Sequence, residues 1–467
     1  MKIQRREPAD CYPLSFAQHR LWFIDQLSQG HRAYNVGRAM RLRGRLNRAA
    51  LDGALTEIVS RHEILRTTYH AVNGIPMQQI APADSVHTPV QDLSGEPAAQ
   101  DERELLRIVD HDIRRPFDLA IDWPIRTLLL QLAPDEHVFV ITVHHIATDS
   151  MTIVLNELSA LYEAGVSGKA ASLPALAVQY ADYAIWERNL LTGSYLERLT
   201  EYWRKQLAGA PHALDLPADL PRQQVLGTDG GRHYFAMDNV PLAALDTLVR
   251  SEKSTRFTTW LTAFGVLLMH YTGQEDILIS GPVACRELPE LEPLIGCFAN
   301  TMVFRLDLSG SPSFREMLGR AGRTVWGALA HRRLPFHLVV DIAKPARNSS
   351  RVPLVQVNFR VAAPDVFTLA GLDGTWLPVG SSGSKFELAA QLSESADGFL
   401  DYNTDLFSVE RISLMARDLE TLMSQLIARP DAPISAAELR PVSEIGPRPI
   451  RPGLPSLARM RKTINIH

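Results

Sequence analysis

Two adjacent histidines and a nearby carboxylate, His144, His145 and Asp149, are the residues of this chain whose types and spacing best suit chemistry. An imidazole has an ordinary pKa of about 6.5, so its neutral form can accept a proton from an attacking amine or hydroxyl near neutral pH. Asp149 could hold the surrounding turn by pairing with an arginine or by capping a helix. The stretch HHIATDS is therefore a candidate site for acyl-transfer chemistry.

This stretch lies where a predicted strand meets a predicted helix. Residues 138–143 are an almost uninterrupted run of β-branched and aromatic side chains, which indicates a buried strand. Apolar residues recur at mostly helical spacing over 153–162, and Asp149 or Ser150 is a suitable N-cap for that helix. Because adjacent strand residues point to opposite faces, only one of the two histidines is expected to be the working base.

The HHxxxD pattern alone is equally compatible with a buried histidine pair that satisfies its hydrogen bonds in a core turn. A zinc site has less support, because Cys11, Cys285 and Cys297 form no CxxC pair and structural zinc prefers closely spaced ligands. Three scattered cysteines indicate a reducing compartment and no disulfide framework.

Length and composition favour a large globular enzyme of two lobes. A chain of 467 residues is longer than a single hydrophobic core usually supports, so two lobes of roughly 200 residues each are expected. The net charge of −4 argues against a general nucleic-acid surface. The N-terminus lacks an apolar signal core, and no stretch approaches the ~18 apolar residues of a membrane span. We therefore expect a cytoplasmic protein that binds neither nucleic acid nor membrane.

Residues 1–175 are predicted to form the first α/β lobe, which carries HHIATDS. Ser15 is a plausible cap for the helix that follows it, and residues 47–66 have the apolar spacing of an amphipathic helix. Residues 128–132 and 138–143 are predicted to be neighbouring strands, and together with residues 39–46 they indicate an α/β lobe.

Residues 176–439 are predicted to form the second lobe. Its first part, 176–207, has a long helical pattern whose aromatic residues we interpret as core and interlobe packing. Residues 211–231 are rich in Pro, Gly and Asp and are predicted to connect the lobes. The remaining predicted elements are a helix over 260–270 and strands over 277–280 and 301–306.

The tail, residues 440–467, is predicted to be a flexible basic extension. Two interpretations remain open, a solvated terminus or a docking element that attracts an acidic carrier or partner by charge. The basic residues concerned are Arg448, Arg451, Arg459, Arg461 and Lys462.

Seven motifs, in order along the chain, resemble those of the condensation domain of nonribosomal peptide synthetases. The motifs are SFAQHRLWF (15–23), RHEILRT (61–67), HHIATDS (144–150), YADYAIW (180–186), IGCFANT (295–301), HRRLPF (331–336) and RNSSRVPLVQVNF (347–359). The resemblance covers nearly the whole chain, from Ser15 to about Leu439. Seven ordered motifs are a specific signal, whereas HHxxxD alone is not.

The resemblance implies an α/β fold of two-layer α+β lobes, a V-shaped pair of chloramphenicol-acetyltransferase-like lobes with a tunnel between them. His145 falls on the family's catalytic histidine, next to His144, and Asp149 falls on its mainly structural partner. In related proteins that aspartate pairs with an arginine, for which Arg286 is the first candidate and Arg66 the second.

The resemblance also implies partners. Acyl carrier or peptidyl carrier proteins would dock at the two tunnel mouths and deliver substrates on phosphopantetheine arms, while the chain itself would act as a monomer and bind no cofactor or metal. The chain contains no carrier motif of the GGxS type, so we expect a free-standing protein that acts in trans. Its acceptor would be a second carrier or a soluble amine or hydroxy acid, and the transfer could release the chain as an amide or ester.

Ser150 stands where the family motif has glycine. Its hydroxyl is either a harmless cap or a group that alters how the acceptor nucleophile is held. Two other functions remain open, an acyl-CoA-dependent acyltransferase of the same superfold and a catalytically silent domain that recruits carriers. Motifs four to seven count against the first, and the presence of His145 counts against the second.

Overall fold

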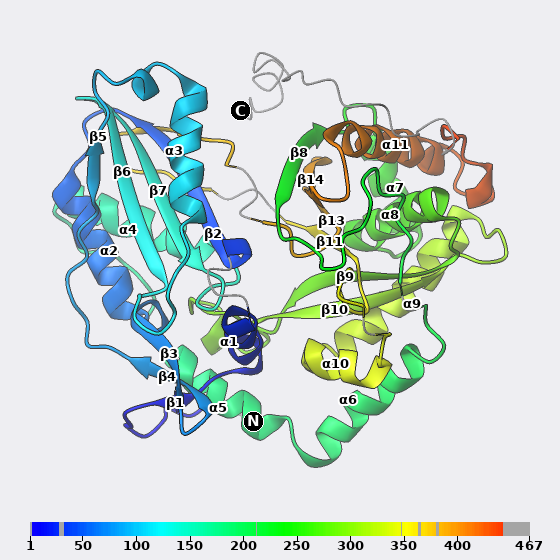
Figure 1. The fold of residues 1–467 in the computed structure, drawn as a ribbon, viewed down its shortest axis with the longest axis horizontal. Coiled ribbons are helices and arrows are strands. Elements are labelled where there is room, and N and C mark those ends of the chain that lie inside the picture. The colour runs from blue at the N-terminus through cyan, green and yellow to red at the C-terminus, as the bar shows by residue number, and fades with distance from the viewer. Residues whose placement is uncertain are drawn as a thin grey trace.

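The computed structural model describes residues 2–27, 32–211, 213–346, 348–362, 366–379 and 383–441. Within these ranges the chain forms two α/β lobes that lie side by side, each around its own large sheet (Figure 1). Both lobes contain helices and strands, interspersed along the chain, in agreement with the predicted α/β class.

The first lobe contains a five-stranded sheet in the order β12-β2-β7-β6-β5. Its strands are β2 (Asn35–Arg43), β5 (Val90–Asp92), β6 (Ile125–Ala133), β7 (Glu136–His144) and β12 (Asp373–Trp376). Strand β12 comes from the second half of the chain and pairs with β2, where Trp376 lies opposite Met40. The first lobe is therefore not a contiguous stretch of sequence.

Helices cover both faces of this sheet, which explains why the central strand β7 is apolar without interruption. Phe139, Ile141 and Val143 pack on one face, against the core that includes α2 and α4, whereas Val138 and Val140 pack on the other, against α3. The helices are α1 (Phe16–Leu27), α2 (Arg48–Arg61), α3 (Glu102–Arg114) and α4 (Thr152–Ser167). A small sheet at the base of the lobe consists of β1 (Tyr12–Pro13), β3 (Thr67–Val72) and β4 (Ile75–Ile80).

Side-chain caps set where the first two helices begin. The Ser15 hydroxyl accepts a hydrogen bond from the Gln18 amide at 3.1 Å, which confirms the predicted cap of α1. The Asn47 side chain accepts from the Ala50 amide and caps α2. Helix α2 ends at Arg61, earlier than the predicted residue 66, because His62 is extended and the chain continues as a 3₁₀ turn, Glu63–Arg66.

The second lobe contains a six-stranded sheet in the order β10-β9-β11-β13-β14-β8. Its strands are β8 (Gly230–Ala236), β9 (Asp276–Ala284), β10 (Ala299–Asp307), β11 (Val357–Val361), β13 (Leu388–Leu392) and β14 (Asp397–Asn403). Its helices are α7 (Leu242–Ser251), α8 (Arg256–Thr272), α9 (Phe314–Ala330), α10 (Phe336–Ala343) and α11 (Val409–Ala428). Helix α8 is buried along most of its length and contacts α9 and α11.

The two cores meet between α5 (Tyr180–Leu190) and α6 (Gly193–Gln206). The aromatic residues of α5 pack in the first-lobe core, and the second-lobe core begins at Leu191. The chain therefore passes from the first-lobe core to the second-lobe core after α5, later than the boundary expected between residues 175 and 176. The segment 211–231 does not connect the lobes as predicted, because Leu214 and Leu216 are already buried in the second-lobe core.

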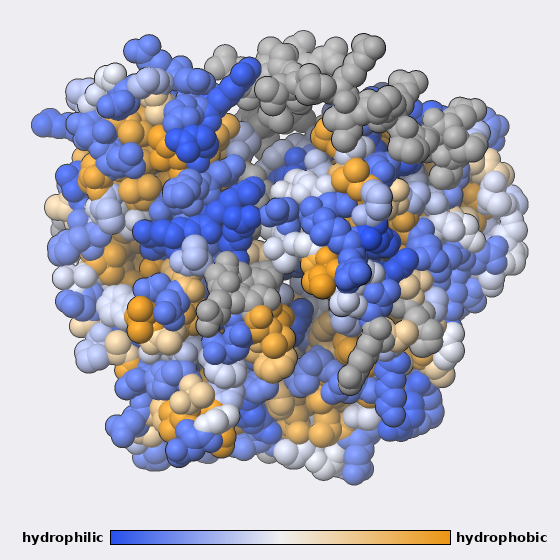
Figure 2. All heavy atoms as spheres, viewed as in Figure 1, coloured by the Kyte–Doolittle hydropathy of each residue, from blue (hydrophilic) through white to orange (hydrophobic). Residues whose placement is uncertain are grey.

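On the face shown in Figure 2, apolar side chains are scattered among hydrophilic ones. No helix in the described ranges is long and apolar enough to cross a membrane. The same ranges contain no cluster of three His, Cys, Asp or Glu side chains that could hold a metal ion. At the C-terminal end, Arg440 pairs with Asp418 at 2.8 Å. The five basic tail residues of the docking hypothesis lie outside the described residues.

Candidate active site

Strand β7 ends at His144, and backbone hydrogen bonds hold the turn that follows. The His144 amide donates to the Pro124 carbonyl at 2.8 Å, and the His145 amide donates to the Tyr34 carbonyl at 2.8 Å. The Ala147 amide then donates back to the His144 carbonyl at 2.9 Å, and Ile146 is fully buried. The histidines therefore lie at the junction of strand and helix, as the sequence predicted.

The two imidazoles have different surroundings. His144 is 3% exposed, its Nδ1 atom accepts from the Ile146 amide at 3.2 Å, and its ring meets Phe117 edge to face. It resembles the satisfied core histidine that one interpretation of the motif described. His145 is half-buried, and its Nδ1 atom lies 4.0 Å from Sγ of Cys297. Cys297 lies in the loop between β9 and β10 of the second-lobe sheet, and this loop packs into the first-lobe core. His145 is therefore the histidine at the seam between the lobes, where this loop meets the first lobe.

Electrostatics keep the His145 imidazole neutral. Burial, and then the positive charge of Lys385, hold the pKa of His145 well below its ordinary value of 6.5, although backbone hydrogen bonds at His145 and Thr148 act in the opposite direction. A neutral imidazole can accept a proton. Burial raises the pKa of the neighbouring Cys297 thiol far above its ordinary value, so this thiol stays protonated and is a poor nucleophile.

An ion pair between the lobes fixes the turn after His145. Asp149 accepts a hydrogen bond from Arg286 at 2.9 Å and another from the Phe298 amide at 3.1 Å. Arg286 also donates to the carbonyls of Leu291 and Leu294, and its guanidinium lies 4.1 Å from the centroid of the Phe298 ring. Asp149 thus forms the pair expected for Arg286, and this pair holds the loop that carries Cys297.

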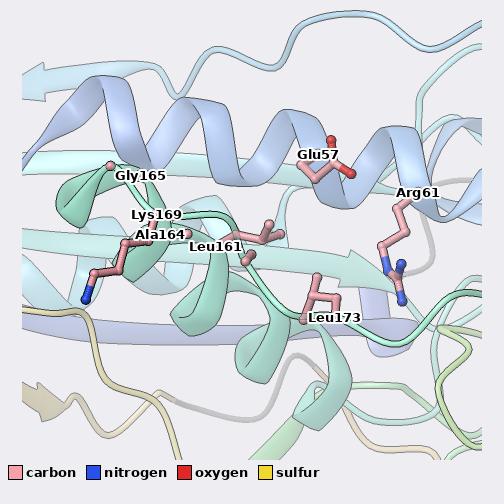
Figure 3. A pocket seen from close by; sticks show the side chains of 9 residues that line it. Glu57, Arg61, Leu161, Ala164, Gly165, Lys169 and Leu173 are labelled. Carbon is pink, nitrogen blue, oxygen red and sulfur yellow. The ribbon is translucent and has the colours of Figure 1, made fainter.

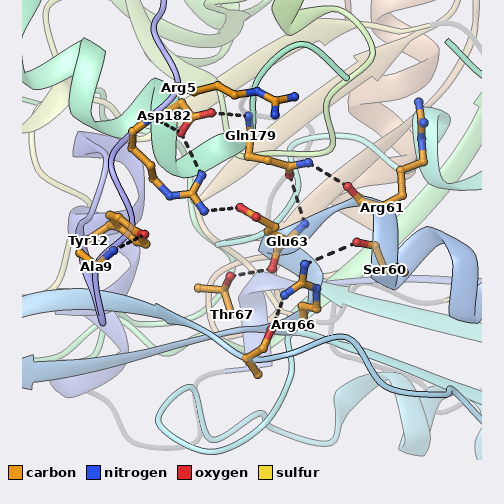
Figure 4. A network of polar contacts seen from close by, with 12 residues as sticks. Arg5, Ala9, Tyr12, Ser60, Arg61, Glu63, Arg66, Thr67, Gln179 and Asp182 are labelled. Atoms are coloured by element: carbon orange, nitrogen blue, oxygen red, sulfur yellow. Dashed lines mark hydrogen bonds and ion pairs between the residues drawn. The ribbon is translucent and has the colours of Figure 1, made fainter. Parts of the chain in front are cut away.

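Arg66, the second candidate, does not pair with Asp149. Its guanidinium donates to the carbonyls of Val59, Ser60 and Ala81. It belongs to a polar network around the end of α2, in which Arg6 bridges Glu63 and Asp182 (Figure 4). Arg66 is therefore a structural residue of the first lobe.

Gly296 allows the loop between β9 and β10 to pack closely against α5 and the turn after His145. Its carbonyl accepts a hydrogen bond from the Asp149 amide at 3.0 Å. A Cβ atom at this position would lie 2.3 Å from the Tyr180 ring and 2.4 Å from the Phe298 ring. Only glycine fits between these rings without a shift of the backbone, which gives a physical reason for the glycine in the fifth motif.

The N-cap of α4 lies at neither Asp149 nor Ser150, the two residues predicted for it. The N-cap is Met151, and the Asp149 carboxylate is engaged by Arg286 and Phe298 instead. Ser150 is exposed, and its hydroxyl accepts from the Thr152 amide at 3.1 Å and contacts the Thr152 hydroxyl at 2.8 Å. Ser150 therefore still satisfies one of the free amides at the start of α4.

This contact predicts the effect of Ser150→Gly. We expect a loss of about 0.5 kcal/mol in the free energy of unfolding, because glycine removes the acceptor for the Thr152 amide but is tolerated near caps. We expect the distribution of products from competing acceptors to stay unchanged, because the hydroxyl is occupied by Thr152. Denaturant titration and mass analysis of competition reactions measure the two effects. A changed acceptor preference would instead assign Ser150 a role in acceptor binding.

A surface pocket of about 530 Å³ lies between α2 and α4, away from this site (Figure 3). Its lining residues are Glu57, Arg61, Leu161, Ala164, Gly165, Gly168, Lys169, Ala171 and Leu173. They come from α2, the C-terminal half of α4 and the segment beyond it, whereas HHIATDS precedes the N-terminus of α4. None of the predicted site residues lines this pocket, so we do not assign the chemistry to it.

Three residues at the site were not among the predicted ones. The Tyr34 carbonyl accepts a hydrogen bond from the His145 amide, and Cys297 faces the His145 ring. Lys385 places its Nζ atom 4.6 Å from the centroid of the Tyr34 ring. Cys297 belongs to the fifth motif, which could have identified it. No spacing pattern could have identified Lys385, because only the fold brings it near the histidines.

Comparisons with known proteins agree with this architecture. The sequence pattern of the family described as Condensation domain matches residues 8–444. Malpinin synthetase of Mortierella alpina is 39% identical over 434 residues, which cover 91% of this chain and 6% of that protein. Phosphinothricin tripeptide synthetase PhsC of Streptomyces viridochromogenes is 38% identical over 446 residues, 93% of this chain and 41% of that protein. The chain thus spans less than half the length of these relatives.

Solved structures have the same fold. The X-domain from teicoplanin biosynthesis aligns with a TM-score of 0.84 and 31% identity, over 94% of this chain and 100% of that one. The first condensation domain of the calcium-dependent antibiotic synthetase aligns with a TM-score of 0.78 and 20% identity, over 92% of this chain and 100% of that one. These alignments confirm the expected pair of chloramphenicol-acetyltransferase-like lobes. Sequence, site geometry and fold together show that the chain belongs to the condensation domain family of nonribosomal peptide synthetases.

Proposed function

We propose that this chain is an active condensation enzyme in natural-product biosynthesis. It transfers an acyl, peptidyl or polyketidyl chain from a phosphopantetheine thioester on a carrier protein to an acceptor amine or hydroxyl, and forms an amide or an ester. Family membership supports acyl transfer between carrier-bound partners. The observation that carries the proposal for this chain is the half-buried His145, held at the lobe seam with a pKa well below 6.5.

In this proposal His145 accepts the proton of the attacking group. A thioester is already activated, so much of the acceleration comes from holding the donor and acceptor in line. Asp149 and Arg286 hold the turn and the facing loop, so their role is to position the site. Because Cys297 is protonated and buried, direct transfer is favoured over a covalent acyl-enzyme.

Transfer in trans, including release onto a soluble amine or hydroxy acid, is part of the proposal. In that case the carrier and the acceptor are separate molecules that reach the site from solution. The exposure that remains at His145 is compatible with such access.

The silent recruitment domain is the second candidate function. One solved structure shows the teicoplanin X-domain in complex with OxyB, and it aligns with a TM-score of 0.81 and 31% identity. A recruitment domain needs a binding surface but no working base. The neutral, partly accessible His145 therefore favours the catalytic proposal.

The test is intact-mass spectrometry of an acyl-loaded carrier incubated with the chain and candidate amines and hydroxy acids. We expect the acyl mass to leave the carrier, with a product of matching mass, only when chain and acceptor are both present. A parallel reaction with acyl-CoA tests the CoA-dependent alternative, which predicts equal or faster transfer from CoA. A carrier that binds the chain and keeps its acyl group with every acceptor would indicate the recruitment function.

A further inference from the structure

Lys385 places a half-buried positive charge between the lobes, close to the candidate base. It precedes β13 of the second lobe, yet its Nζ atom lies 4.6 Å from the centroid of the Tyr34 ring in the first lobe. Among the described residues, no carboxylate lies within 4.0 Å of this ammonium. A partly buried charge without a close counter-ion is unfavourable for folding, so its position calls for a functional explanation.

Tyr34 joins Lys385 to His145. It is the last residue of a 3₁₀ turn, Arg32–Tyr34, and its carbonyl accepts the His145 amide at 2.8 Å. The centroids of the Tyr34 and His145 rings are 6.4 Å apart, at an interplanar angle of 62°. One residue thus contacts both the ammonium and the imidazole.

The surrounding charges do not cancel that of Lys385. His145 is faced by His144, Cys297 and Lys385, and Lys385 by Arg20, Arg360, Cys297 and Asp401. Asp401 is held in a two-bond pair with Arg232, at 2.6 and 2.8 Å. Asp149 is likewise held by Arg286. Both nearby carboxylates are therefore already paired with arginines.

We infer that Lys385 is a positioning residue for acyl transfer. Its positive charge lies beside the Tyr34 ring, which also contacts His145, and this charge disfavours a second proton on the His145 imidazole. Its catalytic consequence rests on the proposed function, whereas its effect on His145 is a property of the chain itself. Burial lowers the pKa of Lys385 to about 7, and the charges of Arg360 and Arg20 add to this effect. Below that pH its ammonium is charged, and this is the range in which an ordinary histidine gains its second proton.

This charge also favours the second of the two proton transfers in the reaction, the one that returns the proton from His145. The acceptor attacks the thioester carbonyl carbon, a C–N or C–O bond forms, and the proton of the acceptor passes to His145. The C–S bond then breaks, its electron pair leaves on sulfur, and the imidazolium returns the proton to the thiolate. A neighbouring ammonium destabilises the imidazolium and thereby favours this return.

The test compares Lys385→Met, which removes the charge, with Lys385→Arg, which keeps it. In a histidine NMR titration of the full chain, we expect Lys385→Met to raise the pKa of His145 by about one pH unit, the scale of a lost charge interaction in a partly buried site. Lys385→Arg should leave this pKa close to that of the unmodified chain. Lys205→Met, at a lysine whose side chain is 76% exposed, is the matched control. The signal of His145 is assigned by its absence from a His145→Ala sample.

The second measurement is the pH dependence of kcat/KM for acyl transfer. Loss of activity toward acid should begin about one pH unit higher in Lys385→Met, and at the original pH in Lys385→Arg. An unchanged His145 pKa in Lys385→Met overturns the inference, even if activity or stability falls, and Lys385→Gln provides the comparison if the methionine variant does not fold. The titration needs no turnover, so an inactive unmodified chain would refute the proposed function and still leave this inference tested.

Discussion

Replacing His145 with alanine is expected to lower the rate of acyl transfer by about 100-fold or more, the usual scale for a lost acid or base group. The alanine cannot accept the proton of the acceptor, whereas the backbone at position 145 can still donate to the Tyr34 carbonyl. The rate is measured as loss of acyl mass from a loaded carrier.

The melting temperature separates this effect from misfolding. His145 is only half-buried, so its alanine variant should melt close to the unmodified chain. His87→Ala, at a histidine whose side chain is 80% exposed, is the matched control and should keep full activity. Near-normal turnover of the His145 variant with a confirmed donor would refute the role assigned to this residue.

Replacing Asp149 with alanine is expected to lower the free energy of unfolding by about 3–5 kcal/mol, the usual cost of removing one partner from a buried ion pair. The Asp149 and Arg286 side chains are 7% and 16% exposed, so the arginine would keep an uncompensated charge between the lobes. The Phe298 amide would also lose its acceptor. Denaturant titration measures the loss, and turnover should fall because the loop beside His145 is no longer held.

A double variant tests whether the unpaired charge of Arg286 causes the loss in the free energy of unfolding. Asp149→Ala combined with Arg286→Met should be less destabilised than the sum of the two single variants, because it leaves no uncompensated guanidinium. Glu104→Ala is the control, because it breaks the exposed pair with Arg107 and should leave the unfolding curve close to that of the unmodified chain. A normal unfolding curve with full activity in Asp149→Ala would contradict the positioning role of this pair.

Local sequence was sufficient wherever the decisive interactions lie within one strand or helix. The apolar run over residues 138–143 predicted β7, and the serine at position 15 predicted the cap of α1. Such elements depend on the spacing at which side chains share one face and on capping residues at the element's own ends. Both can be recognised within a short stretch of sequence. The turn that carries His144 and His145 was predictable for the same reason.

Predictions that depended on packing were less accurate. The boundary expected after residue 175 misses the fact that α5 packs into the first core, and no local pattern predicts that β12 returns to pair with β2. Asp149 does not cap α4, because Arg286 and the Phe298 amide engage its carboxylate. Proline, glycine and polar clusters mark where elements end, but they do not show which core the next element joins.

The sequence by itself determined the family of this protein, the two-lobed class and the motif that contains its candidate base. The resemblance also favoured His145 over His144 and ranked Arg286 ahead of Arg66. The tertiary structure placed His145 against Cys297, paired Asp149 with Arg286, and alone revealed the contact of Lys385 with Tyr34. The physical reason is separation along the chain. Charges and rings from both lobes act on one imidazole through space, and their effect depends on distances of a few ångströms that no spacing in the sequence encodes.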